Sequence, residues 1–398
     1  MQFNELIMGT KTLVIVESPA KAKKISKFLG DDFIVKASFG HVVDLTTSGT
    51  GNLGVDIENN FTPKYEVIPD KKDKVKAIIG AASDAKQIFI ASDPDREGEA
   101  IAWHLEDLLK KTQLPIFRVI FNEITQKAVL KAIKSPGKLD ANLYDAQQAR
   151  RVLDRIVGFS VSPFLIKRFG PQMSAGRVQS VAVRMVVDRE REIEAFKPEE
   201  YWTITTELAK PNSKSDSFTA KIVKRVTNEI DAKQIKLDLD TDSYKVTDIV
   251  EEERSKKPLP PFITSSLASS AAGKYKFPAA KTMKSAQTLY ESGMITYIRT
   301  DSVRLSEDAV ADCRTWLKDN GHDIPNKPMA YATNKAAQDA HEAIRPTDVN
   351  LTPKNVLLSE DDQKIYTLIW ERFVACQMNP AVYDNMIVTV DSSSGHTL

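Results

Sequence analysis

Short apolar runs alternate with amphipathic stretches in the first third of the chain. The apolar runs predict buried strands at Thr12–Glu17, Phe33–Ser38 and Gln87–Ala91. The amphipathic stretches predict helices at Ala20–Leu29, Lys71–Ala82 and Glu97–Lys110. Gly40–Pro69 is polar and rich in turn-forming residues, and we expect no regular elements there. Strands that alternate with helices predict a parallel sheet with helices on its faces.

The pattern changes twice in the rest of the chain. Asp140–Phe196 is predicted to be almost wholly helical, with breaks near Ser162-Pro163 and Gly170-Pro171. Alternating β-branched segments then predict antiparallel strands at Tyr201–Leu208, Ser217–Val226 and Ser243–Val250. After a proline-rich linker, Phe262–Met378 is mainly helical, and Ala381–Asp391 returns to strand character. We therefore expect the second helical part to be inserted into the β part.

Length and composition are typical of a globular protein with several domains. A chain of 398 residues is long enough for about two to four domains. No apolar run is long enough to span a bilayer, and the first residues lack the apolar segment of a signal peptide. Cys313 and Cys376 lie far apart and match neither a disulfide framework nor a zinc motif. We expect a reduced, cytoplasmic protein with no membrane contact.

The charge is unevenly distributed. A net charge of +1 is not that of a simple nucleic-acid binder. The segment 150–184, however, carries seven lysines and arginines against one acid, and 254–304 carries nine against two. Solvated helix faces usually mix both signs, so two basic segments in a neutral protein favour a positively charged groove.

Acidic residues follow the third predicted strand. Asp93, Asp95 and Glu97 lie at the strand end where open α/β sheets bind ligands. Their oxygens suit Mg²⁺, although acids are also favoured at a helix N-terminus by the helix dipole alone. Glu17 ends the first strand, and Lys21 lies about one turn into the next helix. These side chains together predict a site for phosphoryl transfer.

A tyrosine and an arginine stand two residues apart in a later extended stretch. Tyr297 and Arg299 would share one face, where a phenol can be a nucleophile and a guanidinium can hold a phosphate. The alternative is a half-buried strand tyrosine beside a solvated arginine. His341, taken alone, is more typical of a structural histidine. Arg345 precedes Pro346, which favours an extended backbone and an outward-reaching side chain.

Eight motifs in one order make the chain similar to the type IA DNA topoisomerases, in particular the bacterial topoisomerase I branch. The motifs are Leu13–Lys24, Asp93–His104, Phe121–Thr125, Gln147–Arg155, Ser174–Ser180, Thr282–Tyr290, Gly293–Ser302 and His341–Thr347. The resemblance covers nearly the whole chain. It implies a multidomain α/β and α+β fold, in which a Toprim domain with a Rossmann-like parallel sheet joins helical domains and an antiparallel β arch in a clamp.

The resemblance also implies domain boundaries. A Toprim domain is expected at 11–135, a helical DNA-binding domain at 136–200, a β arch at 201–255 and 381–398, and a helical domain with the nucleophile at 256–380. In the family the chain continues past the point that corresponds to Leu398, so we expect an incomplete β arch.

The implied reaction is an ATP-independent cleavage and religation of single-stranded DNA. Tyr297 would attack a phosphodiester to give a 5′-phosphotyrosine and a free 3′-hydroxyl, and after strand passage the hydroxyl would reverse the linkage, relaxing negative supercoils. The absence of a nucleotide-hydrolysis loop agrees with this. The nearest match to a P-loop, Ala268–Lys274, is followed by Tyr275, where serine or threonine is needed.

The resemblance assigns roles to the candidate residues. Arg299 and Lys21 would stabilise charge on the phosphorus, Glu17 would protonate the leaving 3′-oxygen, and His341 would bond near the scissile phosphate. The implied Mg²⁺ ligands are Glu17, Asp93, Asp95 and Glu97. The implied DNA contacts are His41, Arg118, Arg150, Arg151, Asp154, Arg155, Phe159, Ser174, Gly176, Arg177, Gln179 and Arg345. Phe159 stands where relatives often have tyrosine, so a stacking surface is kept without its hydroxyl.

The implied partner is single-stranded or negatively supercoiled DNA, bound by a monomer in the cytoplasm on the nucleoid. Two alternatives remain at this point. One is another Toprim enzyme, a primase or a nuclease, against which the Tyr297 motif argues. The other is a truncated fragment that binds and cleaves single strands without completing strand passage.

Overall fold

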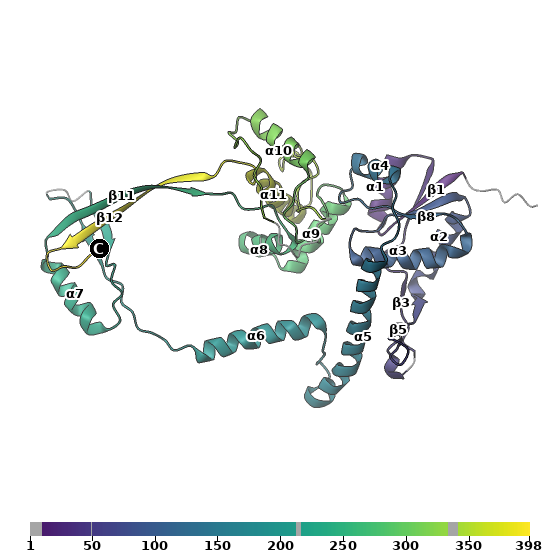
Figure 1. Cartoon of the computed structure of the whole chain (residues 1–398), viewed down its shortest axis with the longest axis horizontal. Helices are drawn as coiled ribbons and strands as arrows, with labels where there is room; N and C mark the ends of the chain where they lie inside the picture. The colour runs from purple at the N-terminus through teal and green to yellow at the C-terminus, as the bar shows by residue number, and fades with distance from the viewer. Residues whose placement is uncertain (1–9, 49, 212–215, 333–340) are drawn as a thin grey trace, which may run out of the picture. The chain divides into compact units, whose positions relative to one another are not determined.

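The chain folds into two compact units in the computed structural model, which describes residues 10–48, 50–211, 216–332 and 341–398 (Figure 1). The first unit contains the described residues up to Ser180 together with Pro258–Asn379. The second unit contains Val181–Lys257 and Pro380–Leu398. The four finer domain boundaries given above stay a prediction.

A four-stranded parallel sheet organises the N-terminal part of unit 1, as predicted. The strands, in the order β2–β1–β7–β8, are β2 (Phe33–Ala37), β1 (Lys11–Val16), β7 (Ala85–Ile90) and β8 (Ile116–Arg118). The accompanying helices are α1 (Pro19–Leu29), α2 (Lys72–Ala82), α3 (Arg96–Leu109) and α4 (Gln126–Lys134).

Alternate side chains of β1 enter two different hydrophobic cores, because neighbouring residues of a strand point to opposite faces of a sheet. Val14 and Val16 are buried in one cluster with residues of α1 and α4. Leu13 and Ile15 are buried in the other with residues of α2 and α3. Both faces of the sheet are therefore covered, as expected for a parallel sheet.

The segment Gly40–Pro69 contains more structure than the sequence predicts. It forms two small antiparallel pairs, β3 (Val43–Leu45) with β6 (Tyr65–Val67) and β4 (Val55–Asp56) with β5 (Thr62–Pro63), and a 3₁₀ turn, η1 (Thr50–Asn52). A second 3₁₀ turn, η2 (Pro69–Lys71), leads into α2, and a third, η3 (Lys110–Thr112), follows α3. The expectation of no regular elements is wrong because the strands are too short to show a periodic pattern.

Two long helices follow the sheet. α5 (Ala141–Phe169) begins at the Asp140 cap and ends at Gly170, whose φ of 114° lies in the region that favours glycine. The predicted break near Ser162-Pro163 is wrong, because α5 continues through Pro163. The break near Gly170-Pro171 is confirmed, and α6 (Arg177–Ala195) begins after it.

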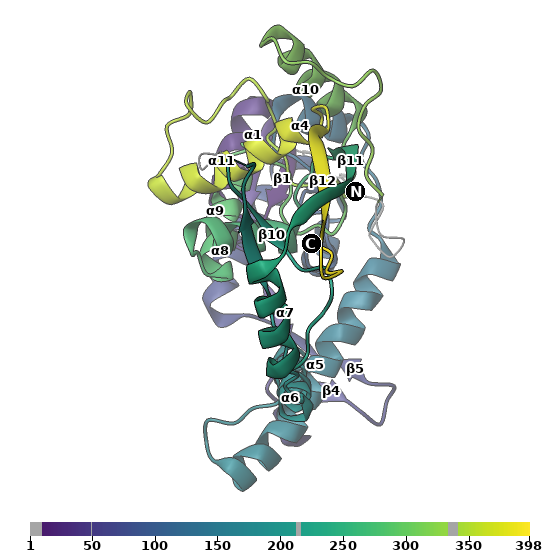
Figure 2. The same ribbon diagram turned by 90° about the vertical axis from the view of Figure 1, so that its left-hand side faces the viewer.

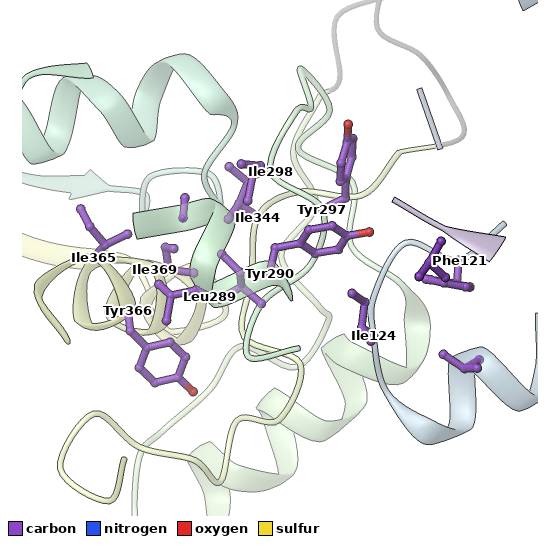
Figure 3. Close-up of a cluster of buried hydrophobic side chains, with 14 of the residues drawn as sticks. Phe121, Ile124, Leu289, Tyr290, Tyr297, Ile298, Ile344, Ile365, Tyr366 and Ile369 are labelled. Carbon is purple, nitrogen blue, oxygen red and sulfur yellow. The ribbon is translucent and has the colours of Figure 1, made fainter. Parts of the chain in front are cut away.

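Four more helices complete unit 1. They are α8 (Thr264–Tyr275), α9 (Ala279–Glu291), α10 (Glu307–Asp319) and α11 (Glu360–Ala375). Side chains of α9 and α11, including Leu289 and Ile369, share one hydrophobic cluster with Phe121 and Ile124 from the sheet-bearing part (Figure 3). This common core joins the loop after α9 to the carboxyl edge of the sheet.

Unit 2 is built on a long antiparallel pair, in which β11 (Tyr244–Lys256) runs beside β12 (Ala381–Ser392), coloured yellow in Figures 1 and 2. A shorter pair is formed by β9 (Thr205–Leu208) and β10 (Phe218–Lys221). The predicted return to strand character near Ala381 is confirmed. Helix α7 (Glu229–Thr241) was not predicted, although Ala232, Ile235 and Leu239 form its buried stripe.

The described helices include none whose length and apolar character would allow it to cross a bilayer.

Candidate active site

Tyr297 is buried in unit 1, in the loop that follows α9. Its backbone N–H donates to the carbonyl of Asn122 at 2.9 Å, which ties the loop to the segment after β8. The ring packs against that of Tyr290, with a centroid separation of 5.2 Å (Figure 3). It also packs against the ring of His341, at 5.8 Å. The phenol is therefore fixed in position, unlike the half-buried strand tyrosine of the alternative interpretation.

The hydroxyl of Tyr297 donates to Asp95. The Oη–Oδ2 distance is 2.6 Å, and the Nη1 atom of Arg299 lies 3.3 Å from the same oxygen. The other oxygen of Asp95 caps α3 by accepting the N–H of Gly98 at 2.8 Å. Burial, reinforced by the charges of Asp95 and Asp93, raises the pKa of Tyr297 well above its ordinary value. The phenol is thus held protonated beside a carboxylate that can accept its proton and a partly exposed arginine.

Lys21 and Asp93 form a buried ion pair at the same edge of the sheet. The Nζ atom of Lys21 donates to Oδ1 of Asp93 and lies 5.1 Å from the ring centroid of Tyr290. The hydroxyl of Tyr290 donates to the same Asp93 oxygen at 3.2 Å. Ser18 caps α1 through the N–H of Lys21, so the lysine leaves the first turn of that helix in a fixed direction. A cation is therefore present next to the predicted nucleophile.

Glu17 ends β1 beside this pair. Its Oε1 atom accepts the N–H of Asp93 at 2.8 Å, and its Oε2 atom lies 3.9 Å from Nζ of Lys21. Burial, followed by the charge of Asp93, raises the pKa of Glu17 to about 7. A carboxyl group with this pKa can both give and take a proton near neutral pH. The parallel sheet thus brings Glu17 and Asp93 together, as their positions after neighbouring strands imply.

His341 and an open cleft complete this side of the site. The Nε2 atom of His341 donates to the carbonyl of Pro94 at 2.8 Å, so the ring is directed at the acidic turn. Asp95, Arg299 and His341 line a cleft of about 800 Å³, together with polar residues from α8 and its preceding loop. A cleft of this size admits a ligand much larger than water.

Glu97 lines this cleft and also a second cavity, of about 210 Å³, beside α5. Its Oε2 atom lies 3.4 Å from Nε2 of His41 and accepts from the side chain of Gln147 at 3.0 Å. These hydrogen bonds, the one from His41 first, lower the pKa of Glu97 to about 2. Arg150 and Arg151 are among the residues that line this cavity.

The four acids predicted to bind Mg²⁺ do not converge. Glu17 and Asp93 lie together, but Asp95 is engaged by Tyr297 and Arg299, and Glu97 is engaged by His41 and Gln147. Among the described residues, no group of three or more histidine, cysteine or acidic side chains is arranged to hold a metal ion. Because Mg²⁺ needs several oxygens around one point, this arrangement does not fit the ion, and no chemical step is derived from it.

Several of the predicted DNA contacts lie along α5 and are already paired. Arg177 donates to both carboxylate oxygens of Asp154, at 2.9 and 2.7 Å, and Arg151 pairs with Asp44. These residues, with His41 and Arg150, line the 210 Å³ cavity. Their contact with DNA stays a prediction.

The remaining predicted contacts of this region lie beside that cavity. The guanidinium of Arg155 lies 4.8 Å from the ring centroid of Phe159, whose side chain is exposed. Ser174 is exposed in the loop before α6. Gln179 packs on Gly176 so closely that a Cβ there would lie 2.5 Å from its amide, so this turn requires glycine or a displaced glutamine.

Arg118 and Arg345, also predicted as DNA contacts, are both buried and engaged by other groups of the protein. Arg118 donates to Glu99 at 2.8 Å and to four backbone carbonyls, including that of Asp93. Arg345 pairs with Glu123 and Glu342, each at 2.9 Å. Contact of either guanidinium with DNA stays a prediction.

Three residues of this site were not predicted from the sequence. Tyr290 contacts Asp93 and Lys21, Glu99 holds Arg118, and Glu123 holds Arg345. Each lies within a motif that was recognised. Their roles were not apparent because they depend on pairing with residues far away in the chain.

Two protein families and several known proteins match the chain. The Toprim domain family matches residues 12–124, and the DNA topoisomerase family matches residues 138–398. The chain is 47% identical over 410 residues to DNA topoisomerase 1 of Rickettsia felis, covering 96% of this chain and 52% of that protein. It is 43% identical over 418 residues to DNA topoisomerase 1 of Pseudomonas aeruginosa, covering 96% of this chain and 48% of that protein.

A solved structure is also similar. Full-length topoisomerase I from Thermotoga maritima matches with a TM-score of 0.83 and 36% identity, over 97% of this chain and 64% of that one. The chain thus spans about half the length of the two curated relatives. The predicted fold class, with its Toprim sheet, helical parts and antiparallel strands, is confirmed. The chain belongs to the bacterial type IA DNA topoisomerases, in the topoisomerase I branch.

Proposed function

We propose that this protein is an ATP-independent type IA DNA topoisomerase that relaxes negative supercoils by transient cleavage of single-stranded DNA. The observation that carries the proposal is the placement of the Tyr297 hydroxyl, 2.6 Å from Asp95, which together with Arg299 lines a cleft of about 800 Å³. A phenol that contacts a proton acceptor, with a cation beside that acceptor, supplies the groups that attack on a phosphodiester needs.

In the cleavage step, the Tyr297 oxygen bonds to phosphorus and its proton passes to Asp95, the carboxylate to which it already donates. The bond from phosphorus to the 3′-oxygen breaks, and Glu17, with its pKa of about 7, gives that oxygen a proton. Arg299 and Lys21 stabilise the charge that develops on the phosphoryl oxygens. Religation is the reverse, so the linkage energy is conserved and no nucleotide is consumed.

His341 acts as a positioning residue in this scheme. Its bond to the Pro94 carbonyl and its contact with the Tyr297 ring fix the turn that carries Asp93 and Asp95. The cavity beside Glu97, with its arginines, binds the strand on one side of the scissile phosphate.

Mg²⁺ is part of the proposal as the cofactor of the full cycle. In the arrangement described above the acids do not fit the ion: Glu17 and Asp93 supply only part of the oxygen donors that it prefers, and binding would require Asp95 or Glu97 to leave its present partners. Titration of Mg²⁺ while following intrinsic tyrosine and tryptophan fluorescence tests this directly. Loss of the response in Asp93→Asn supports the site, and a response equal to that of the unmodified protein removes it.

The proposed partner is single-stranded or negatively supercoiled DNA, and the proposed state is a monomer on the nucleoid in the cytoplasm. The extent of the family matches supports a topoisomerase over a primase or nuclease, and the fragment limited to binding and cleavage stays the alternative. A plasmid relaxation assay with Mg²⁺ and without ATP separates these alternatives. A covalent adduct without relaxation would correspond to the fragment.

The decisive test of the chemistry is a denaturant-resistant adduct with a labelled single-stranded oligonucleotide. The unmodified protein should retain the piece that begins at its 5′ end, and Tyr297→Phe should retain none. Tyr366→Phe is the matched control, since Tyr366 is buried in the same core but donates to Leu351 O, away from the acids. An adduct with Tyr297→Phe would show that another group is the nucleophile.

A further inference from the structure

A phenylalanine with unusual backbone geometry lies at the edge of the sheet next to the active site. Phe39 follows β2, has φ of 61°, and is 41% exposed. A bulky residue in the left-handed region is strained, and such strain persists only where the surroundings impose it. An apolar ring held in water by a strained backbone indicates a binding role.

The surroundings of Phe39 fix it relative to the catalytic groups. The N–H of Ser38 donates to Val16 O at 2.8 Å, and the N–H of Gly40 donates to Glu17 O at 3.1 Å. The loop is therefore bonded to the backbone of the proposed general acid on one side. On the other it continues into His41, which contacts Glu97.

Two lysines flank the exposed ring. Lys71 donates to the carbonyl of Phe39 at 2.8 Å, and its Nζ atom lies 5.8 Å from the ring centroid. The Nζ atom of Lys74, from α2, lies 4.7 Å from the same centroid. Within the described residues, neither ammonium has a carboxylate in ion-pair contact. The stretch 71–76 carries two further lysines, and only Asp73 opposes them there.

We propose that Phe39, Lys71 and Lys74 form an additional single-strand contact, in which one base stacks on the phenylalanine and the ammoniums bind adjacent phosphates. Aromatic platforms flanked by cations are the usual means of holding single strands without reading their sequence. This proposal rests on the proposed function, because it takes the bound ligand to be the single-stranded DNA that Tyr297 cleaves. Phe39 follows β2, the strand that pairs with β1, and Glu17 lies at the end of β1. The contact would extend the path of the bound DNA past His41, toward β2.

The test uses the full chain and a fluorescein-labelled single-stranded oligonucleotide, with affinity measured by anisotropy. Phe39→Ala and Phe39→Leu should both weaken binding about 5-fold or more, and Phe39→Trp should restore it. The control is Phe61→Ala, because Phe61 is 52% exposed and also has positive φ (57°), but no cation lies over its ring among the described residues. Thermal melting verifies that all four variants are folded. Equal affinity of Phe39→Ala, Phe39→Leu and the unmodified protein overturns the stacking contact.

The lysines are tested through the salt dependence of the same binding. Lys74→Gln should lower the slope of log affinity against log salt concentration by about 0.7, the contribution of one phosphate on a single strand. An unchanged slope overturns the phosphate contact of Lys74. Adduct formation through Tyr297 at saturating oligonucleotide separates the two proposals. If the unmodified protein forms the adduct and the Phe39 variants bind normally, only the platform fails. If it neither binds nor forms the adduct, the proposed function itself fails.

Discussion

Two acids of one turn, Asp95 and Glu97, lie in contrasting surroundings. On the side of Asp95, the site is buried, and the nearby Glu17 has its pKa raised to about 7 because burial outweighs the effect of Lys21. On the side of Glu97, hydrogen bonds from His41 and Gln147 lower the pKa to about 2. The pKa values of two carboxyl groups at this edge of the sheet, Glu17 and Glu97, are thus shifted in opposite directions.

The contrast indicates a division of labour. A carboxyl group that titrates near neutral pH can move protons, whereas one that stays ionised can only hold cations or orient hydrogen-bond donors. We infer that the side with Tyr297, Glu17 and Asp95 carries the chemistry. The side with Glu97 and the arginines of α5 carries strand binding.

Of the variants considered, Glu17→Gln should have the largest effect, and the effect should be on the rate of cleavage. It removes the proton donor for the leaving 3′-oxygen, so single-turnover cleavage should slow by about 10²–10⁴-fold, while affinity for single-stranded DNA changes little. Rapid-quench measurement of adduct formation and anisotropy measure the two quantities separately. If Glu17→Gln instead bound single-stranded DNA weakly but cleaved it normally at saturating DNA, the Glu17 side would be the binding side, contrary to our assignment.

Glu99→Gln should destabilise the fold by about 3–5 kcal/mol, because it leaves the buried Arg118 charge uncompensated. Urea unfolding measures the change. Asp107→Asn on the same helix is the control, since its pair with Lys110 is exposed and contributes about 1 kcal/mol or less. Equal losses of unfolding free energy in the two variants would show that the buried Glu99–Arg118 pair does not stabilise the fold more than an exposed pair does.

Glu97→Gln should have the smallest effect on stability, about 1 kcal/mol or less, because Glu97 is partly exposed. The folded-state pKa of about 2 lies below the ordinary value of 4.5, so the contribution of Glu97 is present above about pH 4.5 and is lost as the pH falls toward 2. Urea unfolding at several acidic pH values should show this loss in the unmodified protein and a flatter dependence in the variant. A steeper dependence in the variant would contradict the assigned pKa.

The sequence predicted the parallel sheet and the neighbourhood of Glu17 and Asp93 because both depend on local rules. Apolar runs mark buried strands, and the ends of parallel strands meet at one edge. The continuation of α5 through Pro163 was missed because the sequence rule for proline marks a probable break. That rule ignores the helical residues on both sides of the proline, and helices that continue through a proline are its known exception.

The arginines show where local rules stop. Arg299 and Arg345 lie in recognised motifs and Arg118 lies just before one, yet of the three only Arg299 is exposed at the cleft. Whether an arginine reaches solvent depends on the carboxylate opposite it, and Glu99 and Glu123 come from other parts of the fold. The separation of Glu97 from the other acids has the same origin, since its partner Gln147 comes from α5.

The pH dependence of single-turnover cleavage tests the division most directly. Adduct formation is measured without Mg²⁺, on an oligonucleotide short enough for its released 3′ piece to dissociate. Because Glu17 must be protonated to act as the acid, the rate in the unmodified protein should fall as the pH rises through about 7, and Glu17→Gln should lose this dependence. A fall near pH 7 that persists unchanged in Glu17→Gln would contradict the account.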